Sequence, residues 1–182
     1  MNRLLRLLWL MLRSRHRTRV SPFGPCRTPF RVWFTDLDPL LHMNNGIYLC
    51  IMDLGRLDLM IRSGLWRVIN AQQWYTVVVA ETIQFRRSLN LFQRFSISTR
   101  VLGWDDKAIV IEQSFIRGEE VVAHALVRAR VLKKSGGNVA PGELLLAAGM
   151  NAESPPLEGH AARWNAEQAT WHGAKAHRVS GP

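Results

Sequence analysis

The chain is 182 residues long, 47% hydrophobic and 21% charged, which excludes a disordered chain and is enough for one domain to bury a core. Its two cysteines and six histidines are scattered along the sequence, so we expect no disulfide framework, no metal site and no cofactor. The net charge of +10 is concentrated at the start, because residues 1–19 carry six arginines and no acidic residue. Such an arm attracts anionic surfaces.

Residues 1–20 form a basic and apolar N-terminal arm. The uninterrupted apolar run, residues 7–12, is too short to span a bilayer, which takes about 20 apolar residues. A secretory signal fits less well, because residues 13–19 offer no small-residue cleavage site. The pattern fits an amphipathic helix on a membrane surface, with Trp9 at the interface and the arginines toward lipid phosphates. A frayed basic tail without a partner is the alternative. No nucleic-acid partner is expected, because the arm has one aromatic residue and no recognition motif.

Three segments lead from the arm to the first long helix. Residues 21–29 are rich in Pro and Gly and predict a linker, and residues 30–35 are a short β-prone run. Residues 36–45 predict a loop, and either Asn44 or Asn45 suits the N-cap of the helix that follows.

That helix is expected over residues 45–63, because Gly64 provides a stop signal. Its first half is apolar nearly all round, so it must be buried on most sides. Four strand-like runs follow, and tight turns between the last three predict a meander of antiparallel hairpins. The runs are residues 74–85, 95–104, 107–116 and 119–134.

This order of elements predicts an α+β domain over residues 21–150. A helix that is apolar on all sides needs a cover that curves, and a five-stranded antiparallel sheet wrapped around the helix provides one. Residues 141–149 predict a short helix at the end of the domain. Residues 151–182 are polar and rich in Ala, His and Gly, so we expect them to form a disordered tail.

The loop before the long helix carries a recognisable motif. Residues 35–48 read TDLDPLLHMNNGIY, which resembles the D-x-x-G-H-x-N-N-x-x-Y signature of 4-hydroxybenzoyl-CoA thioesterase-like hot-dog proteins. Residues 86–89 and 105–107 resemble later segments of that family, and the likeness covers about residues 27–135. The motif looks most like the branch of thioesterase superfamily member six proteins, and it implies a hot-dog fold and a thioester substrate. Leu41 replaces the family's glycine before the histidine, which adds bulk at the mouth of the site.

The resemblance assigns the catalytic chemistry to this motif. Asp38 matches the family's catalytic aspartate and would act as general base or as nucleophile on the thioester carbon. A backbone N–H at the helix start, near Asn45 or Gly46, would hold the oxyanion, because helix N-termini carry unpaired donors and partial positive charge. Two alternatives stay open: Asp38 only hydrogen-bonds loop amides, or Asp36 takes the catalytic role.

Substrate contacts are expected from the motif and from a basic stretch beyond the second strand. Arginines suit the phosphates of coenzyme A, and they equally suit a solvated strand end. His42 also fits a hydrogen-bonded structural residue, and Tyr48 also fits a core residue. The expected substrate-binding residues are His42, Asn44, Gly46, Tyr48, Arg86 and Arg87, and Arg94 belongs to the same basic stretch.

These residues together predict an enzyme that hydrolyses acyl thioesters of coenzyme A or of an acyl-carrier protein. The alternative is a non-catalytic acyl- or lipid-binding hot-dog protein, which Leu41 in place of glycine favours. The resemblance implies a homodimer or tetramer. We expect a cytoplasmic protein, and a peripheral one at the inner membrane face if residues 1–19 form a surface helix.

Overall fold

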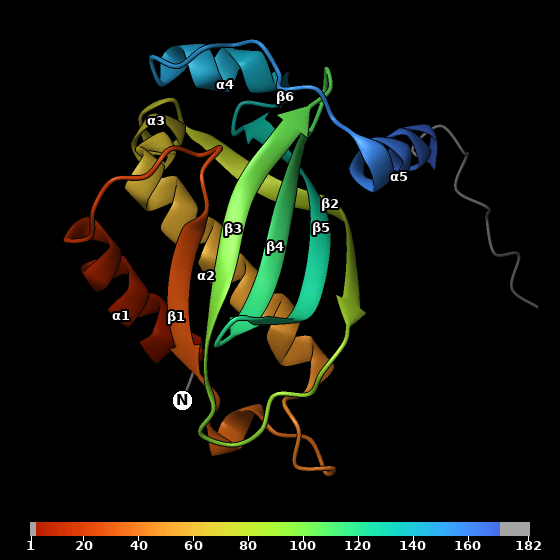
Figure 1. Cartoon of the computed structure of the whole chain (residues 1–182). Coiled ribbons are helices and arrows are strands. Elements are labelled where there is room, and N and C mark those ends of the chain that lie inside the picture. Colours follow the sequence, from red (N-terminus) through yellow and green to blue (C-terminus); the bar gives the residue numbers. More distant parts are fainter. Residues whose placement is uncertain (1–2, 172–182) are drawn as a thin grey trace, which may run out of the picture.

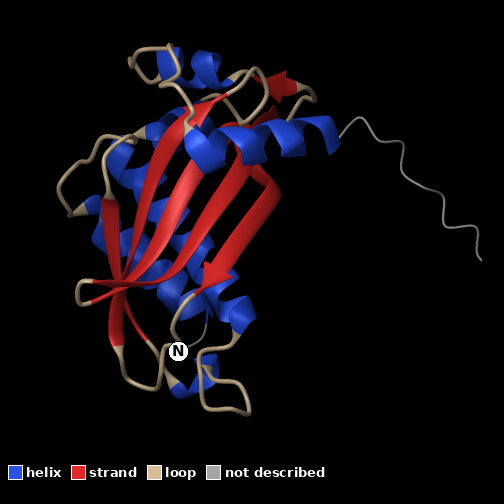
Figure 2. Ribbon diagram, turned by 45° about the vertical axis from the view of Figure 1, so that its right-hand side comes forward, coloured by secondary structure: helices blue, strands red, loops and turns tan. Residues whose placement is uncertain are grey.

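The centre of the fold is a long helix, α2 (Asn45–Ser63), which lies across the concave side of a curved sheet (Figures 1 and 2). The computed structural model describes residues 3–171. The strands are β1 (Cys26–Arg31), β2 (Trp74–Phe85), β3 (Arg94–Trp104), β4 (Ile109–Arg117), β5 (Glu120–Lys133) and the short β6 (Asn138–Val139). Their order is β1-β3-β4-β5-β2, with β6 beside β5, and every neighbouring pair is antiparallel. The predicted α+β class, a long helix wrapped by a curved antiparallel sheet, is confirmed, and the short β6 is added to the five strands expected.

Three β-bulges help the sheet to curve around α2. An extra residue in one strand bends that strand and increases its twist, so a bulged sheet can close over a helix. The inward side chains of β3, β4 and β5 then pack on the apolar first half of α2 as one continuous core. The extra residues at these register shifts are Val79 on β2, Leu102 on β3 and Val122 on β5.

Local signals set the ends of α2 and its closest approach to the sheet. The Asn44 side chain caps the helix by accepting the Gly46 N–H at 2.8 Å, and Gly64 ends it in the left-handed region at φ 87°. Gly55 faces the sheet so closely that a Cβ there would lie 2.9 Å from Ile97 Cγ2. The absence of a side chain at Gly55 therefore lets the helix and the sheet meet.

The N-terminal helix, α1 (Arg3–Arg15), packs on the outside of α2 and beside β1 (Figure 1). Its inward side chains are mainly polar, since Arg6 forms a buried ion pair with Asp36 at 2.5 Å. Leu10 is the apolar exception and is buried. The prediction that the arginines of the arm face lipid phosphates is therefore wrong for Arg6. None of the described helices is both long and apolar enough to cross a bilayer.

Asp58 of α2 holds the end of α1 and the segment that follows it. Its carboxylate is fully buried and accepts hydrogen bonds from Ser14 (2.6 Å), Thr28 (2.6 Å) and Arg17 (2.9 Å). Arg62, one turn later on α2, approaches the same carboxylate at 3.5 Å. A buried carboxylate needs such partners, and Arg17 is thereby another arginine of the arm that faces the protein.

β1 begins earlier than the sequence predicts. The linker expected over residues 21–29 is wrong for residues 26–29, because Cys26 and Thr28 are buried and pair with β3. Pro29 argued against a strand here, because proline has no backbone N–H to donate to a neighbouring strand. β1 lies at the edge of the sheet, where proline is tolerated because only one side of the strand is paired.

Two short helices close one end of the fold. α4 (Pro141–Ala147) confirms the short helix that was expected near the end of the domain. α3 (Leu65–Ala71) follows directly after Gly64 and was not predicted. Leu65 and Ile69 of α3 are buried, so this helix also contributes to the core.

The disordered tail expected over residues 151–182 is wrong for residues 159–171, which form α5 (Gly159–Trp171). α5 lies on the convex side of the sheet (Figure 2). Asn165 accepts a hydrogen bond from buried Arg128 of β5 at 2.9 Å, and Trp164 is buried beside it. Residues 151–158 of the predicted tail are in neither a helix nor a strand, and residues 172–182 lie outside the described residues.

Candidate active site

Backbone hydrogen bonds fix the loop between β1 and α2 in place. It begins with a 3-10 turn, η1 (Phe34–Asp36), and then folds back on itself. The Met43 N–H donates to the Leu89 carbonyl at 2.8 Å, and the Asn44 N–H donates to the carbonyl of the last residue of η1 at 2.8 Å. These bonds hold residues 38–42 beside the N-terminus of α2.

Asp38 is the half-buried carboxylate at this tip. Its Oδ1 accepts the N–H groups of Leu40 (2.9 Å) and His42 (3.2 Å), which is the loop-locking role considered from the sequence. No hydrogen bond to Oδ2 is recorded within residues 3–171. One oxygen of Asp38 therefore holds the loop in shape, and the other is available to a reactant.

Asp36, the competing carboxylate, is bound to other groups of the protein. Its side chain is 2% exposed, pairs with Arg6 and accepts the Trp33 N–H at 2.7 Å. A carboxylate that is buried and paired in this way is poorly placed to meet a substrate. The structure thus gives Asp36 the loop-holding role and leaves Asp38 as the candidate for chemistry.

The first turn of α2 supplies the candidate oxyanion donor. The Gly46 N–H is bound to the Asn44 side chain, and the Ile47 N–H is bound to the Asn44 carbonyl at 2.9 Å. The backbone N–H of Asn45 has no recorded acceptor in the described part of the chain. It lies at the positive end of a 19-residue helix, where a developing negative charge is stabilised.

A polar cavity of about 250 Å³ brings most of the predicted site residues together. Asn44 and Gly46 do not line this cavity; the Gly46 N–H donates to the Asn44 side chain in the helix cap. Met43, Phe85 and Ser88 complete its wall. The predicted residues that line it are Asp38, His42, Asn45, Tyr48, Arg86 and Arg87.

Tyr48 belongs to the core as well as to this cavity. Its side chain is buried against the rings of Phe85 and Phe115, at centroid distances of 5.0 Å and 4.8 Å. Burial raises the pKa of the Tyr48 phenol above its ordinary value of 10.0. The phenol is therefore neutral at physiological pH and can donate a hydrogen bond but cannot act as a base.

Arg86 and Arg87 follow the end of β2 and place positive charge at the mouth of the cavity. The Val122 carbonyl accepts both of their backbone N–H groups, at 2.8 Å and 3.1 Å, which fixes the turn. Their side chains are exposed, and that of Arg87 lies 3.4 Å from Glu120. Arg94 does not line this cavity and lies instead in a groove beside α1.

The position of the family glycine has a left-handed backbone in this chain. Leu41 has φ 62°, a conformation that glycine adopts without strain and that costs a leucine energy. Its side chain is 71% exposed at the tip of the loop. The glycine of the motif thus has a conformational reason in addition to the close approach of a substrate.

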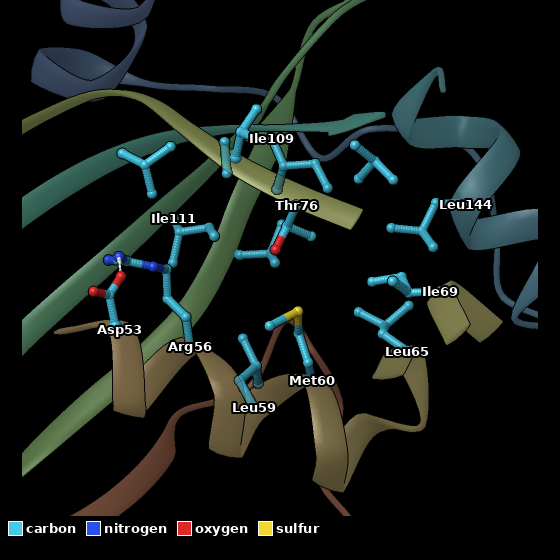
Figure 3. A pocket seen from close by; sticks show the side chains of 15 residues that line it. Asp53, Arg56, Leu59, Met60, Leu65, Ile69, Thr76, Ile109, Ile111 and Leu144 are labelled. Atoms are coloured by element: carbon cyan, nitrogen blue, oxygen red, sulfur yellow. Dashed lines mark hydrogen bonds and ion pairs between the residues drawn. The ribbon is translucent and has the colours of Figure 1, made fainter. Parts of the chain in front are cut away.

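A second, apolar cavity of about 360 Å³ lies farther along α2 (Figure 3). Leu59 and Met60 of α2 face it across from β2 and β4, and Leu144 of α4 lies at one end. Asp53 and Arg56, which form an ion pair, supply its charged rim. The cavity is large enough for the chain of a small apolar ligand.

α3, which the sequence did not predict, contributes to the wall of this second cavity. Leu65 and Ile69 line it from α3. The signal was present, because Leu65, Val68 and Ile69 have the apolar i, i+3, i+4 spacing of a helix face. The pattern is only two turns long, so the stop signal at Gly64 outweighs it and the sequence predicts no helix after Gly64.

The sequence and the fold resemble those of known proteins. The chain is 41% identical over 95 residues to Protein THEM6 of Xenopus laevis, covering 52% of this chain and 46% of that protein. It is 37% identical over 111 residues to Protein THEM6 of Danio rerio, covering 60% of this chain and 55% of that protein. The chain thus spans about half the length of these curated relatives.

Solved structures agree with this comparison. YbaW Probable Thioesterase from Escherichia coli superposes with a TM-score of 0.62 and 26% identity, over 66% of this chain and 94% of that chain. DHNA-CoA Thioesterase from Staphylococcus aureus superposes with a TM-score of 0.60 at 13% identity, over 83% of this chain and 95% of that chain, and shows the fold alone.

The central helix in its curved sheet, with the motif loop at the helix N-terminus, defines a hot-dog protein of the thioesterase type. Residues 32–165 match the model of the Thioesterase-like superfamily, and the chain belongs to that family. The resemblance stated from the sequence is therefore confirmed. The activity of this chain, its mechanism and its substrate are matters of proposal.

Proposed function

We propose that the chain hydrolyses an acyl thioester in the cavity at the N-terminus of α2. The observation that carries the proposal is the Oδ2 atom of Asp38 in the same cavity as Asn45, whose N–H begins the helix. Carboxylate and oxyanion donor are the two groups that thioester hydrolysis needs from a protein. No residue of the proposal requires a metal or a cofactor.

In the proposed reaction, Asp38 acts on a water molecule as general base. The water oxygen bonds to the thioester carbon, its proton passes to Oδ2, and the carbonyl electron pair moves to an oxygen that the Asn45 N–H stabilises. Collapse of this intermediate breaks the C–S bond, and the thiolate takes the proton from Asp38. Direct attack by Asp38 would instead break the C–S bond and form an acyl anhydride that water then hydrolyses. If that water attacks the aspartyl carbonyl, isotopically labelled water would mark Asp38 in a single turnover, which general-base hydrolysis would not do.

The proposed substrate is a thioester of coenzyme A or of an acyl-carrier protein. Arg86 and Arg87 at the cavity mouth suit the phosphates of either carrier, because guanidinium groups bind phosphate with charge-assisted hydrogen bonds. His42 and Tyr48 line the space between these arginines and the reacting centre. The apolar cavity farther along α2 suits the acyl chain.

A homodimer through β2 would connect these two cavities. β2 is an edge strand with Tyr75, Val78 and Phe85 exposed, and such an edge is protected when it pairs with another strand. Antiparallel pairing about a two-fold axis sets the start of one β2 opposite the end of the other. The apolar cavity of one protomer, at Thr76, would then adjoin the polar cavity of its partner, at Phe85.

A non-catalytic acyl- or lipid-binding protein is the second candidate. Two observations favour it: Asp38 Oδ1 is committed to the loop, and the Leu41 side chain stands at the tip of that loop. In this role the same two cavities would bind an acyl thioester without cleaving it.

The deciding experiment is thiol release from acyl-CoAs of increasing length, from acetyl to palmitoyl, by the wild-type chain and by Asp38→Asn. Asparagine still accepts the Leu40 and His42 N–H groups, so the loop keeps its shape while the base is lost. We expect turnover to fall at least about 100-fold, and Asp106→Asn, an exposed carboxylate on the β3–β4 turn, to leave it unchanged. Binding without release by both proteins would establish the second candidate and overturn the first.

A further inference from the structure

The helix α1 presents its apolar side to the solvent. Its inward positions, Arg6, Leu10 and Ser14, lie four residues apart on one face and are buried against the protein. The other side carries Leu5, Leu8, Trp9 and Leu12, each between 44% and 66% exposed. A helix in water normally turns its apolar face to the core, so this exposed face indicates an apolar partner.

The exposed face forms one wall of an apolar groove of about 670 Å³ between α1 and β1. Pro29, Phe30 and Trp33 form the opposite wall. Two further exposed rings continue the apolar surface beyond the groove, since Phe92 lies 6.1 Å from Trp33 and 5.1 Å from Phe34. The groove therefore belongs to an apolar surface larger than α1 itself.

Every charged side chain that lines this groove is an arginine. Arg6 is neutralised by Asp36, whereas Arg13, Arg31 and Arg94 are exposed around the rim. Two of them stack on aromatic rings of the surface, Arg13 over Trp9 at 4.7 Å and Arg31 over Phe92 at 5.8 Å. An apolar centre with a basic rim is complementary to lipid chains below a layer of anionic headgroups.

We propose that this α1–β1 face docks on the surface of an anionic phospholipid bilayer, with the apolar side chains at the boundary between headgroups and acyl chains. Attachment was expected from residues 1–19, but the surface differs from that expectation. The apolar part comes from α1 together with Pro29, Phe30 and Trp33, and much of the basic rim comes from β1 and β3, through Arg31 and Arg94. A second copy of the chain fits this face poorly, because self-association would bring the arginine rims together.

The docking face also lies clear of the proposed dimer edge. β1 and β2 are at opposite edges of the sheet, so pairing through β2 leaves α1 and β1 uncovered. The inference therefore goes beyond thioester hydrolysis and stands or falls separately from it. A protein that docks but does not hydrolyse would refute only the proposed enzyme, and the reverse result would refute only the docking face.

The test is co-sedimentation of the full chain with vesicles of phosphatidylcholine alone and of phosphatidylcholine mixed with phosphatidylglycerol. We expect binding to the mixed vesicles, and roughly tenfold or greater weakening by the double variant Leu8→Gln/Leu12→Gln. Leu146→Gln is the matched control, because Leu146 on α4 is 65% exposed against 66% for Leu12. Arg94→Gln should weaken binding to the mixed vesicles about fivefold, and Arg67→Gln on α3 should not.

Three outcomes would overturn the proposal. The first is no binding of the wild-type chain to the mixed vesicles. The second is equal weakening by the leucine pair and by Leu146→Gln, which would point to a general loss of apolar surface. The third is lipid-free self-association that Leu8→Gln/Leu12→Gln abolishes, seen by analytical ultracentrifugation, which would make the face an interface between copies. Circular dichroism of each variant checks that α1 and the domain remain folded.

Discussion

Replacement of Leu41 by glycine should both stabilise the protein and open its site. Leu41 has φ 62°, and the left-handed region costs a residue with a Cβ about 1–2 kcal/mol relative to the right-handed one. Glycine removes that strain but gives the unfolded chain more freedom, which offsets about 0.4–1 kcal/mol. The difference leaves a gain of about 1 kcal/mol in the free energy of unfolding, which raises Tm by about 2–4 °C in a chain of this size.

The neighbouring leucine provides the matched control. Leu40 is 75% exposed, like Leu41, but does not share its positive φ, so Leu40→Gly should lower Tm by about 1–3 °C through the unfolded state alone. Leu41→Ala separates bulk from backbone, since it removes the side chain at the loop tip and keeps the strain. Calorimetry and acyl-CoA turnover of the three variants are the measurements. Similar falls in Tm for Leu41→Gly and Leu40→Gly would refute the argument from backbone strain.

Two further predictions concern stability and pH. Gly55→Ala should lower the free energy of unfolding, measured in urea titrations, by about 1–3 kcal/mol, because the new Cβ would lie 2.9 Å from Ile97 Cγ2 and Thr99 Oγ1. In a helix that is not crowded, alanine instead raises the free energy of unfolding relative to glycine. Such a rise for Gly55→Ala would contradict the close packing. Hydrogen bonds from His124 and then Arg100 lower the pKa of Glu112 from 4.5 to about 2. A depressed carboxylate pKa stabilises the fold above the unfolded value, so the advantage of wild type over Glu112→Gln should shrink as pH falls from about 5 to about 3. A difference in denaturation midpoint that stays constant over this range would count against that pairing.

Elements with strong local signals were predictable from the sequence. The helix of residues 45–63 begins after a capping Asn44 and ends at Gly64, and the structure has these bounds. β2 likewise spans residues 74–85 as predicted, because its β-prone run is long and bounded by turns. In these segments the local preference and the tertiary packing agree, so a single sequence is enough.

Elements that depend on distant partners were not predictable in the same way. α5 has little apolar character. Its place on the sheet rests on Asn165 meeting Arg128 of β5, 37 residues earlier, and on Trp164 packing with Val110 and Leu126. The pattern of α1 predicts an amphipathic helix but not which face meets the protein. That choice depends on Arg6 finding Asp36, 30 residues later. The periodicity of a sequence shows that a helix has an apolar and a polar face. Which face is buried depends on the residues elsewhere in the chain that the helix packs against.

In the candidate site, too, the residues close together in the sequence were predictable, and those whose role depends on a distant partner were not. Motif spacing was enough to select Asp38, His42, Asn45 and Tyr48, because the loop and the first turns of one helix bring them together. The choice between Asp36 and Asp38 required the structure. Asp36 Oδ2 holds α1 through Arg6, and the Asp36 carbonyl accepts the N–H of Asn44, the residue that caps α2.

Asp36 therefore joins the proposed docking face to the proposed reaction site. Its side chain fixes α1, its backbone fixes the N-cap of α2, and the loop tip that carries Asp38 lies between these two attachments. A bilayer bound to α1 would thus contact an element that is rigidly connected to the oxyanion donor of Asn45. The roles proposed for the two aspartates are consistent with this arrangement: the buried, paired Asp36 would set the geometry, and the half-buried Asp38 would meet the substrate through its second oxygen.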